Sequence, residues 1–188
     1  MEREDAILHI IKNMINIMPN TLRYEVLLNW WGIDQEDAVF NNLPDLLKYE
    51  ILNSEEPPEY VMDDRYNSLI IEALKVKYIG VRNEFLSKKI SEILYTSHVV
   101  EGVQEELITC PCCEYKTLPQ KGEYDICPVC FWEDDGNTDL QYYSSPNHMS
   151  LAQARVNFTN FGAVNKLSLQ FLEADRLELY SKWKYDWP

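Results

Sequence analysis

The chain has 188 residues, of which 46% are hydrophobic and 26% charged, and this globular composition excludes an intrinsically disordered protein. Thirty-one acidic residues against seventeen basic ones give a formal net charge of -14, which disfavours non-specific binding to the phosphate backbone of a nucleic acid. The sequence has no apolar run of transmembrane length, and its acidic start is unlike a signal peptide, so we expect a cytoplasmic protein without membrane contact.

Helical periodicity dominates the first hundred residues and predicts an α-helical bundle. Pro19 is expected to end the first helix, and Gly32 to form the left-handed cap of the second. Asp34 and Asp45 are placed to cap two short helices that follow. The expected helices cover residues 4–18, 22–31, 35–40, 46–52, 64–78 and 83–95.

This periodicity stops at about residues 100–106, where residues 105–109 are typical of a short strand. We therefore place a domain boundary there, with an α-helical domain over residues 1–103 and a second module over residues 104–188. The predicted fold class is α+β and mostly α, with an N-terminal helical bundle and then a small zinc-ribbon-like β module with C-terminal helices.

All five cysteines lie between residues 110 and 130, in two copies of the pattern Cys-Pro-x-Cys. Two residues between cysteines allow a tight turn to direct both sulfurs at one ion, and the proline pre-sets the turn. Two such turns supply the four thiolates of a closed tetrahedral zinc site. Residues 114–126 are expected to form a hairpin between the turns, with residues 121–123 at its tip. The predicted zinc ligands are Cys110, Cys113, Cys127 and Cys130.

Cys112 is the fifth cysteine and leaves alternatives open. It could replace Cys110 or Cys113 as a ligand, or react with oxidants. A thioredoxin-like redox pair is a weaker reading because no strand–helix context surrounds the motif. A nucleophilic Cys112 would need a partner from elsewhere in the fold, such as His148. A closed four-cysteine site stabilises a fold and does not activate water, so we expect no enzyme.

An acidic segment follows the second cysteine pair. Phe131 and Trp132 are expected to shield the zinc site from solvent. The acids after them are interpreted as a solvated turn, as an edge that faces a protein partner, or as a calcium loop that lacks the closing glutamate. The candidate partner-binding residues are Trp132, Glu133, Asp134, Asp135 and Asp139.

Two helices are expected near the C-terminal end. Ser150 begins a capping box for a helix that ends at Gly162. Ser168 is predicted to open a last helix that reaches about Lys182. Residues 180–188 are rich in aromatic side chains and would either pack on the fold or form a hot-spot-like surface.

The two cysteine turns, the run from Phe131 to Gly136 and the pattern from Ser150 to Gly162 resemble the bacterial cysteine-rich CPCC family. The resemblance covers about residues 107–165, and Glu114 stands where this family commonly has glycine. It implies a zinc-ribbon-like module of a kind found near polymorphic toxin systems, where such proteins look like immunity partners.

Three functions follow as hypotheses. The preferred one is a non-catalytic immunity protein with a structural zinc ion, whose acidic surface binds a basic toxin domain, such as a nuclease. A nucleic-acid-binding zinc ribbon is the second, although only Lys116 and Lys121 are basic between the cysteine pairs. A thiol-dependent enzyme that uses Cys112 is the third.

Overall fold

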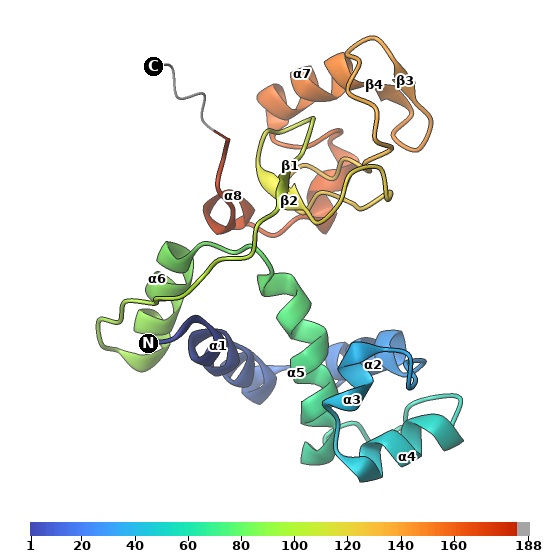
Figure 1. Cartoon of the computed structure of the whole chain (residues 1–188), viewed down its shortest axis with the longest axis vertical. Helices are drawn as coiled ribbons and strands as arrows, with labels where there is room; N and C mark the ends of the chain where they lie inside the picture. Colours follow the sequence, from blue (N-terminus) through green and yellow to red (C-terminus); the bar gives the residue numbers. More distant parts are fainter. Residues whose placement is uncertain (184–188) are drawn as a thin grey trace. The chain divides into compact units, whose positions relative to one another are not determined.

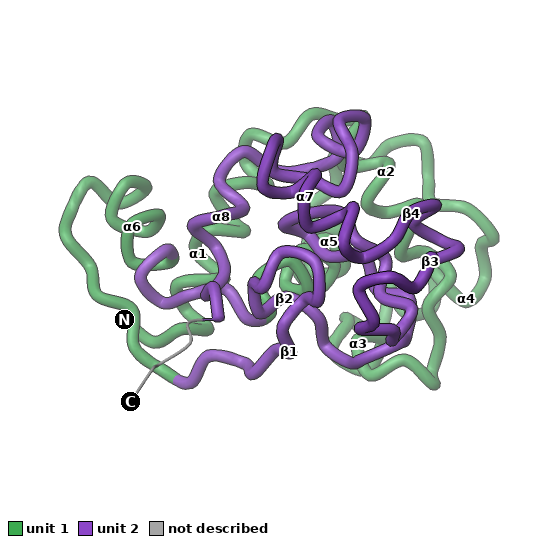
Figure 2. The backbone as a smooth tube through the Cα atoms, turned by 90° about the horizontal axis from the view of Figure 1, so that it is seen from above, with its two compact units in different colours: residues 1–79, 86–102 green, residues 80–85, 103–188 purple. Residues whose placement is uncertain are grey.

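A computed structural model describes residues 1–183 and divides the chain into two compact units. Unit 1 comprises residues 1–79 and 86–102, and unit 2 comprises residues 80–85 and 103–188 (Figure 2). The chain enters unit 2 briefly at residues 80–85 and for the second time between Gly102 and Val103. Residues 80–85, assigned from the sequence to the helical domain, are grouped with unit 2. Independent folding of two domains divided at 103/104 stays a prediction.

Unit 1 is helical, with short 3-10 turns at both ends of one helix (Figure 1). Helices α1 and α2 both lie against α5, so α5 is the centre of the bundle. No helix in the described part of the chain combines the length and apolar character needed to cross a membrane. The elements are α1 (Arg3–Ile17), α2 (Asn20–Trp30), α3 (Ala38–Asn41), α4 (Asp45–Asn53), η1 (Asp64–Tyr66), α5 (Asn67–Lys75), η2 (Val76–Tyr78) and α6 (Asn83–Leu94).

The apolar spacing of α1 explains its packing. Its buried side chains include Ala6, Ile7, Ile10 and Ile11, which repeat at three and four residues and so form one face. The next helix brings in a buried charge, since Arg23 is 2% exposed. Its guanidinium donates to the carbonyl of Val61 and the side chain of Asn67, at 3.0 and 2.7 Å. Such pairing offsets the cost of burying the charge.

Three details of unit 1 differ from the sequence prediction. Gly32 does not have a left-handed backbone, and Trp31 ends α2 in the right-handed region. The short helix starts at Ala38 rather than residue 35, because the Asp34 carboxylate accepts the Glu36 N–H and stabilises a turn instead. Asp45 lies inside α4, which has no side-chain cap. The caps predicted at Gly32, Asp34 and Asp45 from local sequence are therefore not formed.

Unit 2 combines two antiparallel strand pairs with short helices. β1 (Ile108–Thr109) pairs with β2 (Lys116–Leu118), and β3 (Tyr143–Ser144) pairs with β4 (Met149–Ser150). α7 (Leu151–Phe161) follows β4 directly. The later elements are η3 (Leu167–Phe171) and α8 (Arg176–Leu179). The predicted fold class, α+β and mostly α, is confirmed.

Helix α7 agrees with its predicted signals at both ends. The Ser150 hydroxyl accepts the Gln153 N–H at 3.2 Å, and Gly162 takes a left-handed φ of 80°. The predicted last helix is wrong: the structure has a 3-10 turn, an extended residue at Leu172, and then one short turn of helix. Tertiary contacts explain the break, since Phe171 stacks on Phe131 at a centroid distance of 5.4 Å.

The predicted hairpin over residues 114–126 is also wrong. β1 and β2 pair across the first cysteine turn, and an antiparallel bridge between Ile126 and Glu133 closes the second, so the cysteine turns themselves are the hairpin loops. Residues 121–123 instead form a connection in which the Gly122 N–H donates to Asp134 at 2.7 Å. The first strand is shorter than expected and starts at Ile108.

Candidate metal centre

The first cysteine turn is closed by its own backbone. The Cys110 N–H donates to the Tyr115 carbonyl at 2.8 Å, and the Glu114 N–H donates to the Cys110 carbonyl at 3.0 Å. Strands β1 and β2 continue from the two ends of this turn. The chain thus enters and leaves side by side, and the turn is held at one end of a hairpin.

The second turn repeats this arrangement seventeen residues later. The Cys127 N–H donates to the Trp132 carbonyl at 2.8 Å, and the Phe131 N–H donates to the Cys127 carbonyl at 2.8 Å. An antiparallel bridge between Ile126 and Glu133 takes the place of the strand pair. The matching prolines in the sequence therefore correspond to two equivalent turns.

The residue after each pair has a left-handed backbone. Glu114 has a φ of 67° and Phe131 a φ of 69°, in a region where non-glycine residues are uncommon. A left-handed residue there turns the chain back and lets its N–H reach the carbonyl of the first cysteine. A glycine at residue 114, which the CPCC resemblance implies, would fit this conformation without strain.

The two turns bring four sulfur atoms together. The Sγ atoms of Cys110, Cys113, Cys127 and Cys130 all lie within 4.8 Å of one another, and all four side chains are buried. The distance from Cys110 to Cys130 is 3.7 Å, and that from Cys113 to Cys127 is 3.6 Å. A zinc ion with about 2.3 Å bonds to four sulfurs would set them about 3.8 Å apart. All are free thiols and too far apart for disulfides.

The thiols influence one another's protonation. Burial, with hydrogen bonds to Cys110 as a second cause, raises the pKa of Cys113 and of Cys130. The pKa of Cys127 falls well below its usual value even though burial, the largest effect, raises it. Hydrogen bonds from the other three cysteines and from Thr117 stabilise its thiolate. A cation at the centre would favour the thiolate form of all four.

A comparison with known protein families confirms the resemblance of this part of the chain to the CPCC family. Residues 108–176 match the family model described as Cysteine-rich CPCC. The match runs from the start of β1 to the first residue of α8, further than the resemblance seen in the sequence, and includes all four clustered cysteines. The N-terminal helical region is covered by no family. No curated protein and no solved structure matches the chain.

Three side chains within the matched residues 108–176 contact the cysteine turns without belonging to the four-sulfur cluster. The Thr117 hydroxyl lies 3.1 Å from the Cys127 sulfur. The Nε of Arg155 donates to the Pro111 carbonyl in the first turn at 2.9 Å. The Nε of Arg176 donates to the Val129 carbonyl in the second turn at 3.0 Å. Each turn therefore has its own arginine, and the two positive charges lie close to a site rich in thiolates.

Sequence reasoning missed these supporting roles. The family pattern on α7 included Arg155, but its position on a helix gave no sign that it reaches the first turn. Arg176 lies 46 residues after Cys130, so no local spacing connects it with the second turn. Both contacts depend on tertiary folding.

Cys112 lies in the first turn but outside the four-sulfur cluster. It is 3% exposed, and within residues 1–183 it has no hydrogen bond to His148, which is exposed in the connection between β3 and β4. Its burial restricts access to a substrate. Among the described residues, the four cysteines are the one group of metal-binding side chains that the fold gathers.

The acidic segment after the second turn is used partly in the fold. Trp132 and Asp134 are 1% and 2% exposed, so their expected role at a partner-facing edge is corrected to an internal one. The carboxylate of Asp134 accepts the N–H groups of Gly122 and Gly136 and joins two loops. Burial of Trp132 agrees with its expected place beside the cysteine turns.

The other predicted edge residues keep some access to solvent. Glu133 and Asp135 are half-buried and Asp139 is exposed. Asp135 accepts the Asn137 N–H at 3.2 Å, and Asp139 accepts the Gln141 N–H at 2.9 Å. These carboxylates therefore stabilise turns, which fits the expectation of a solvated turn.

Asn147 attaches the β3–β4 connection to the second cysteine turn. Its side-chain oxygen accepts the Glu133 N–H at 2.9 Å, and its nitrogen donates to the Glu133 carbonyl and the Ser144 hydroxyl, both at 2.7 Å. One amide thus pairs with both backbone groups of Glu133 in the manner of a neighbouring strand. No local pattern in the sequence predicted this contact.

Proposed function

We propose that Cys110, Cys113, Cys127 and Cys130 bind one zinc ion that stabilises unit 2. The observation that carries the proposal is the four-sulfur cluster, whose 3.6 and 3.7 Å separations fit the edges of a zinc tetrahedron. Among the described residues of unit 2, the strands around this cluster are two or three residues long, so its regular structure contributes little on its own. A structural zinc ion would add on the order of 10 kcal/mol to the folding of such a module.

Replacement of the zinc by cobalt(II) tests the ligand set directly. Cobalt bound by four thiolates in a tetrahedron should give strong visible and thiolate-to-metal charge-transfer absorption at one equivalent. Titration with zinc should then bleach the spectrum, because zinc competes for the same sulfurs. A spectrum typical of six-coordinate cobalt, or binding that survives replacement of Cys127, would contradict the proposal.

We further propose that the protein acts by binding another protein and not by catalysis. Four thiolates fill a tetrahedral site, so no coordination position is left for water or substrate. The remaining thiol, Cys112, is buried. These two features favour a role for the cysteine-rich unit as a rigid scaffold.

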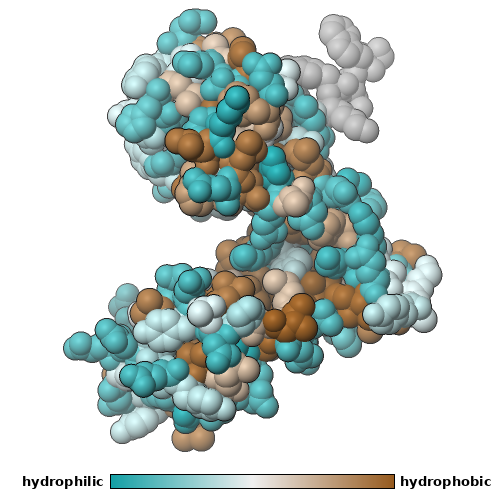
Figure 3. All heavy atoms as spheres, turned by 180° about the vertical axis from the view of Figure 1, so that it is seen from behind, coloured by the Kyte–Doolittle hydropathy of each residue, from teal (hydrophilic) through white to brown (hydrophobic). Residues whose placement is uncertain are grey.

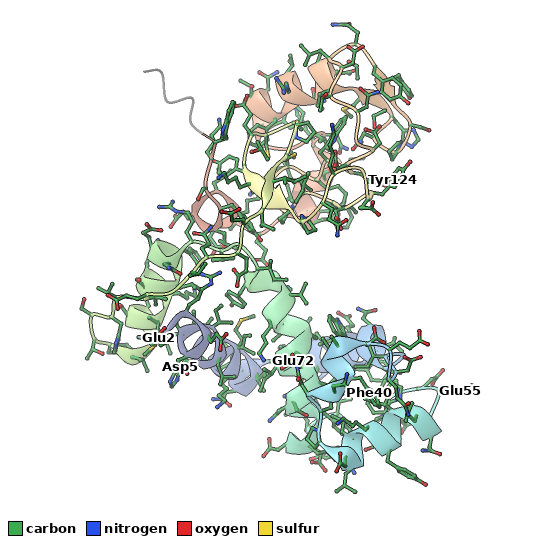
Figure 4. The ribbon with its side chains drawn as sticks, viewed as in Figure 1. Glu2, Asp5, Phe40, Glu55, Glu72 and Tyr124 are labelled. Atoms are coloured by element: carbon green, nitrogen blue, oxygen red, sulfur yellow. The ribbon has the colours of Figure 1, made fainter. Side chains whose placement is uncertain are left out.

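The preferred partner is a basic toxin domain, such as a nuclease, neutralised in the cytoplasm. A net charge of -14 would speed encounter with such a partner and could cover the surface it uses for nucleic acid. Exposed acids occur on unit 1 as well, including Glu2, Asp5 and Glu55 (Figure 4). The match to the CPCC family model agrees with the resemblance that first suggested an immunity role.

Co-expression with any toxin domain that a neighbouring gene encodes tests the immunity role. Cells that make both proteins should survive, and the purified proteins should form a one-to-one complex whose association rate falls as salt rises. Reversal of Glu133, Asp135 and Asp139 to lysine should weaken the complex more than reversal of Glu2, Asp5 and Glu55, which changes the net charge by the same amount on unit 1. If no neighbouring toxin is suppressed, the immunity proposal fails, while the zinc proposal is unaffected.

A further inference from the structure

A surface hollow of about 640 Å³ lies in unit 2 beside the first cysteine turn. Its lining comes from that turn, from α7, from α8 and from the chain after α8, whose elements can be followed in Figure 1. All of these residues belong to unit 2. The side chains that matter most are Tyr115, Arg155, Phe158, Phe161, Leu177 and Lys182.

Aromatic and aliphatic side chains form much of the wall. The rings of Tyr115 and Phe158 meet edge to face, with centroids 6.5 Å apart. Phe161 is half-buried, and Leu177 is 45% exposed although it is apolar. Apolar groups left open to solvent on this face would gain free energy by covering a second apolar surface. Figure 3, which draws one face of the molecule, shows further hydrophobic patches between hydrophilic side chains.

Two cations border the same hollow. The Arg155 side chain makes one hydrogen bond, from Nε to the Pro111 carbonyl, so within residues 1–183 its two terminal nitrogens have no protein acceptor. Lys182 lies 5.8 Å above the Tyr115 ring and 3.9 Å from a Glu114 oxygen, with half of its side chain exposed. The hollow thus has two positive groups and one negative group in a chain whose net charge is -14.

A fixed guanidinium beside aromatic rings fits a particular chemistry. The guanidinium is planar and can bind both oxygens of a carboxylate, and the rings accept an aromatic or aliphatic side chain next to it. A nucleic acid fits poorly, since its many phosphates would be repelled by the acidic surroundings. A peptide segment with one or two carboxylates meets the cations with far less repulsion.

We propose that this hollow binds an extended segment of another protein in which acidic residues alternate with aromatic ones. The carboxylate pairs with Arg155, Lys182 contributes a second positive charge, and an aromatic side chain packs on Phe158 and Leu177. This surface is separate from the acidic one proposed for a basic toxin. The peptide-binding proposal goes beyond the proposed function and does not depend on the immunity role.

Fluorescence anisotropy with a labelled peptide tests the proposal on the zinc-loaded full chain. The probe has the sequence Gly-Ser-Trp-Asp-Phe-Glu-Gly, and its matched control replaces the two acids by their amides. The acidic probe should bind at least tenfold more tightly, and added salt should weaken it, because a charge-assisted hydrogen bond is lost in the control. Equal affinity for both peptides would overturn the proposal.

Leu177→Asp places a negative charge at an exposed position in the hollow. The matched control is Leu167→Asp, because Leu167 is 78% exposed and does not line the hollow. The first variant should abolish binding of the probe and the second should not. Arg155→Met should weaken binding at least tenfold with one zinc still bound. Binding that is lost equally in both leucine variants would contradict the assignment of the hollow.

A chain that ends at Trp183 completes the test. The sequence after this residue contains Tyr185, Asp186 and Trp187, which have the same chemistry as the probe. The full and shortened chains should bind the probe with affinities within threefold of each other. Binding by the shortened chain alone would show that the chain's own end is the occupant, and the proposal of a separate partner would then be wrong.

Discussion

Cys112 and Cys113 are adjacent cysteines that are almost equally buried. If the proposed zinc site is correct, replacing them should have very different effects, because only Cys113 binds the metal. Their side chains are 3% and 2% exposed, but only the Cys113 sulfur lies in the four-sulfur cluster. Cys113→Ala removes one of four ligands and should cost most of the roughly 10 kcal/mol that a structural zinc ion contributes. Since domains are typically stable by about 5–15 kcal/mol, unit 2 should be unfolded in this variant at 25 °C.

Cys112→Ala removes a single buried sulfur atom that binds no metal, and it should cost about 1 kcal/mol. For a unit of this size, such a loss lowers the melting temperature by roughly 4–8 °C. Thermal melts in equimolar zinc, followed by near-ultraviolet circular dichroism and native mass spectrometry, separate the two results. If both variants keep one zinc ion, or if both lose it, the assignment of the ligands is refuted.

Four further predictions concern the site and its surroundings. Because burial raises the pKa of Cys113 and Cys130, zinc must displace their protons, so the zinc affinity and the melting temperature at fixed free zinc should fall as pH drops from 7.5 to 5.5. Asn147→Ala loses three hydrogen bonds and should destabilise unit 2 by about 2–3 kcal/mol in urea titrations, and an unchanged midpoint would count against the proposed attachment. Glu114→Gly relieves a left-handed backbone and should stabilise unit 2 by up to about 1 kcal/mol. Phe131→Gly relieves the same strain but loses a stacked ring, so calorimetry should show a lower melting temperature.

The sequence predicted the features that depend on short-range spacing. Two Cys-Pro-x-Cys turns are local, and their repeated form is enough to indicate that four sulfurs converge. The ends of α7 are also local, since Ser150 caps a backbone N–H three residues later and Gly162 supplies the left-handed residue. In each case the residues that determine the structure lie within one turn of one another.

The features that the sequence did not predict depend on contacts between segments far apart in the chain. The apolar pattern after Ser168 is compatible with a long helix, but Phe171 stacks on Phe131 and Arg176 binds the Val129 carbonyl. These contacts fix the chain in a conformation that a continuous helix would not allow. The hairpin between the cysteine pairs failed for a similar reason, because spacing alone does not say whether a turn lies inside a hairpin or between two hairpins.

Metal content and thiol count of the purified full chain, measured on the same sample, test the central claim most directly. Elemental analysis should find one zinc ion per chain, and denaturation in the presence of a chelator should release five free thiols. Removal of the metal should at the same time unfold unit 2. Protein that contains no metal and yet keeps the near-ultraviolet signal of a folded unit 2 would contradict the account.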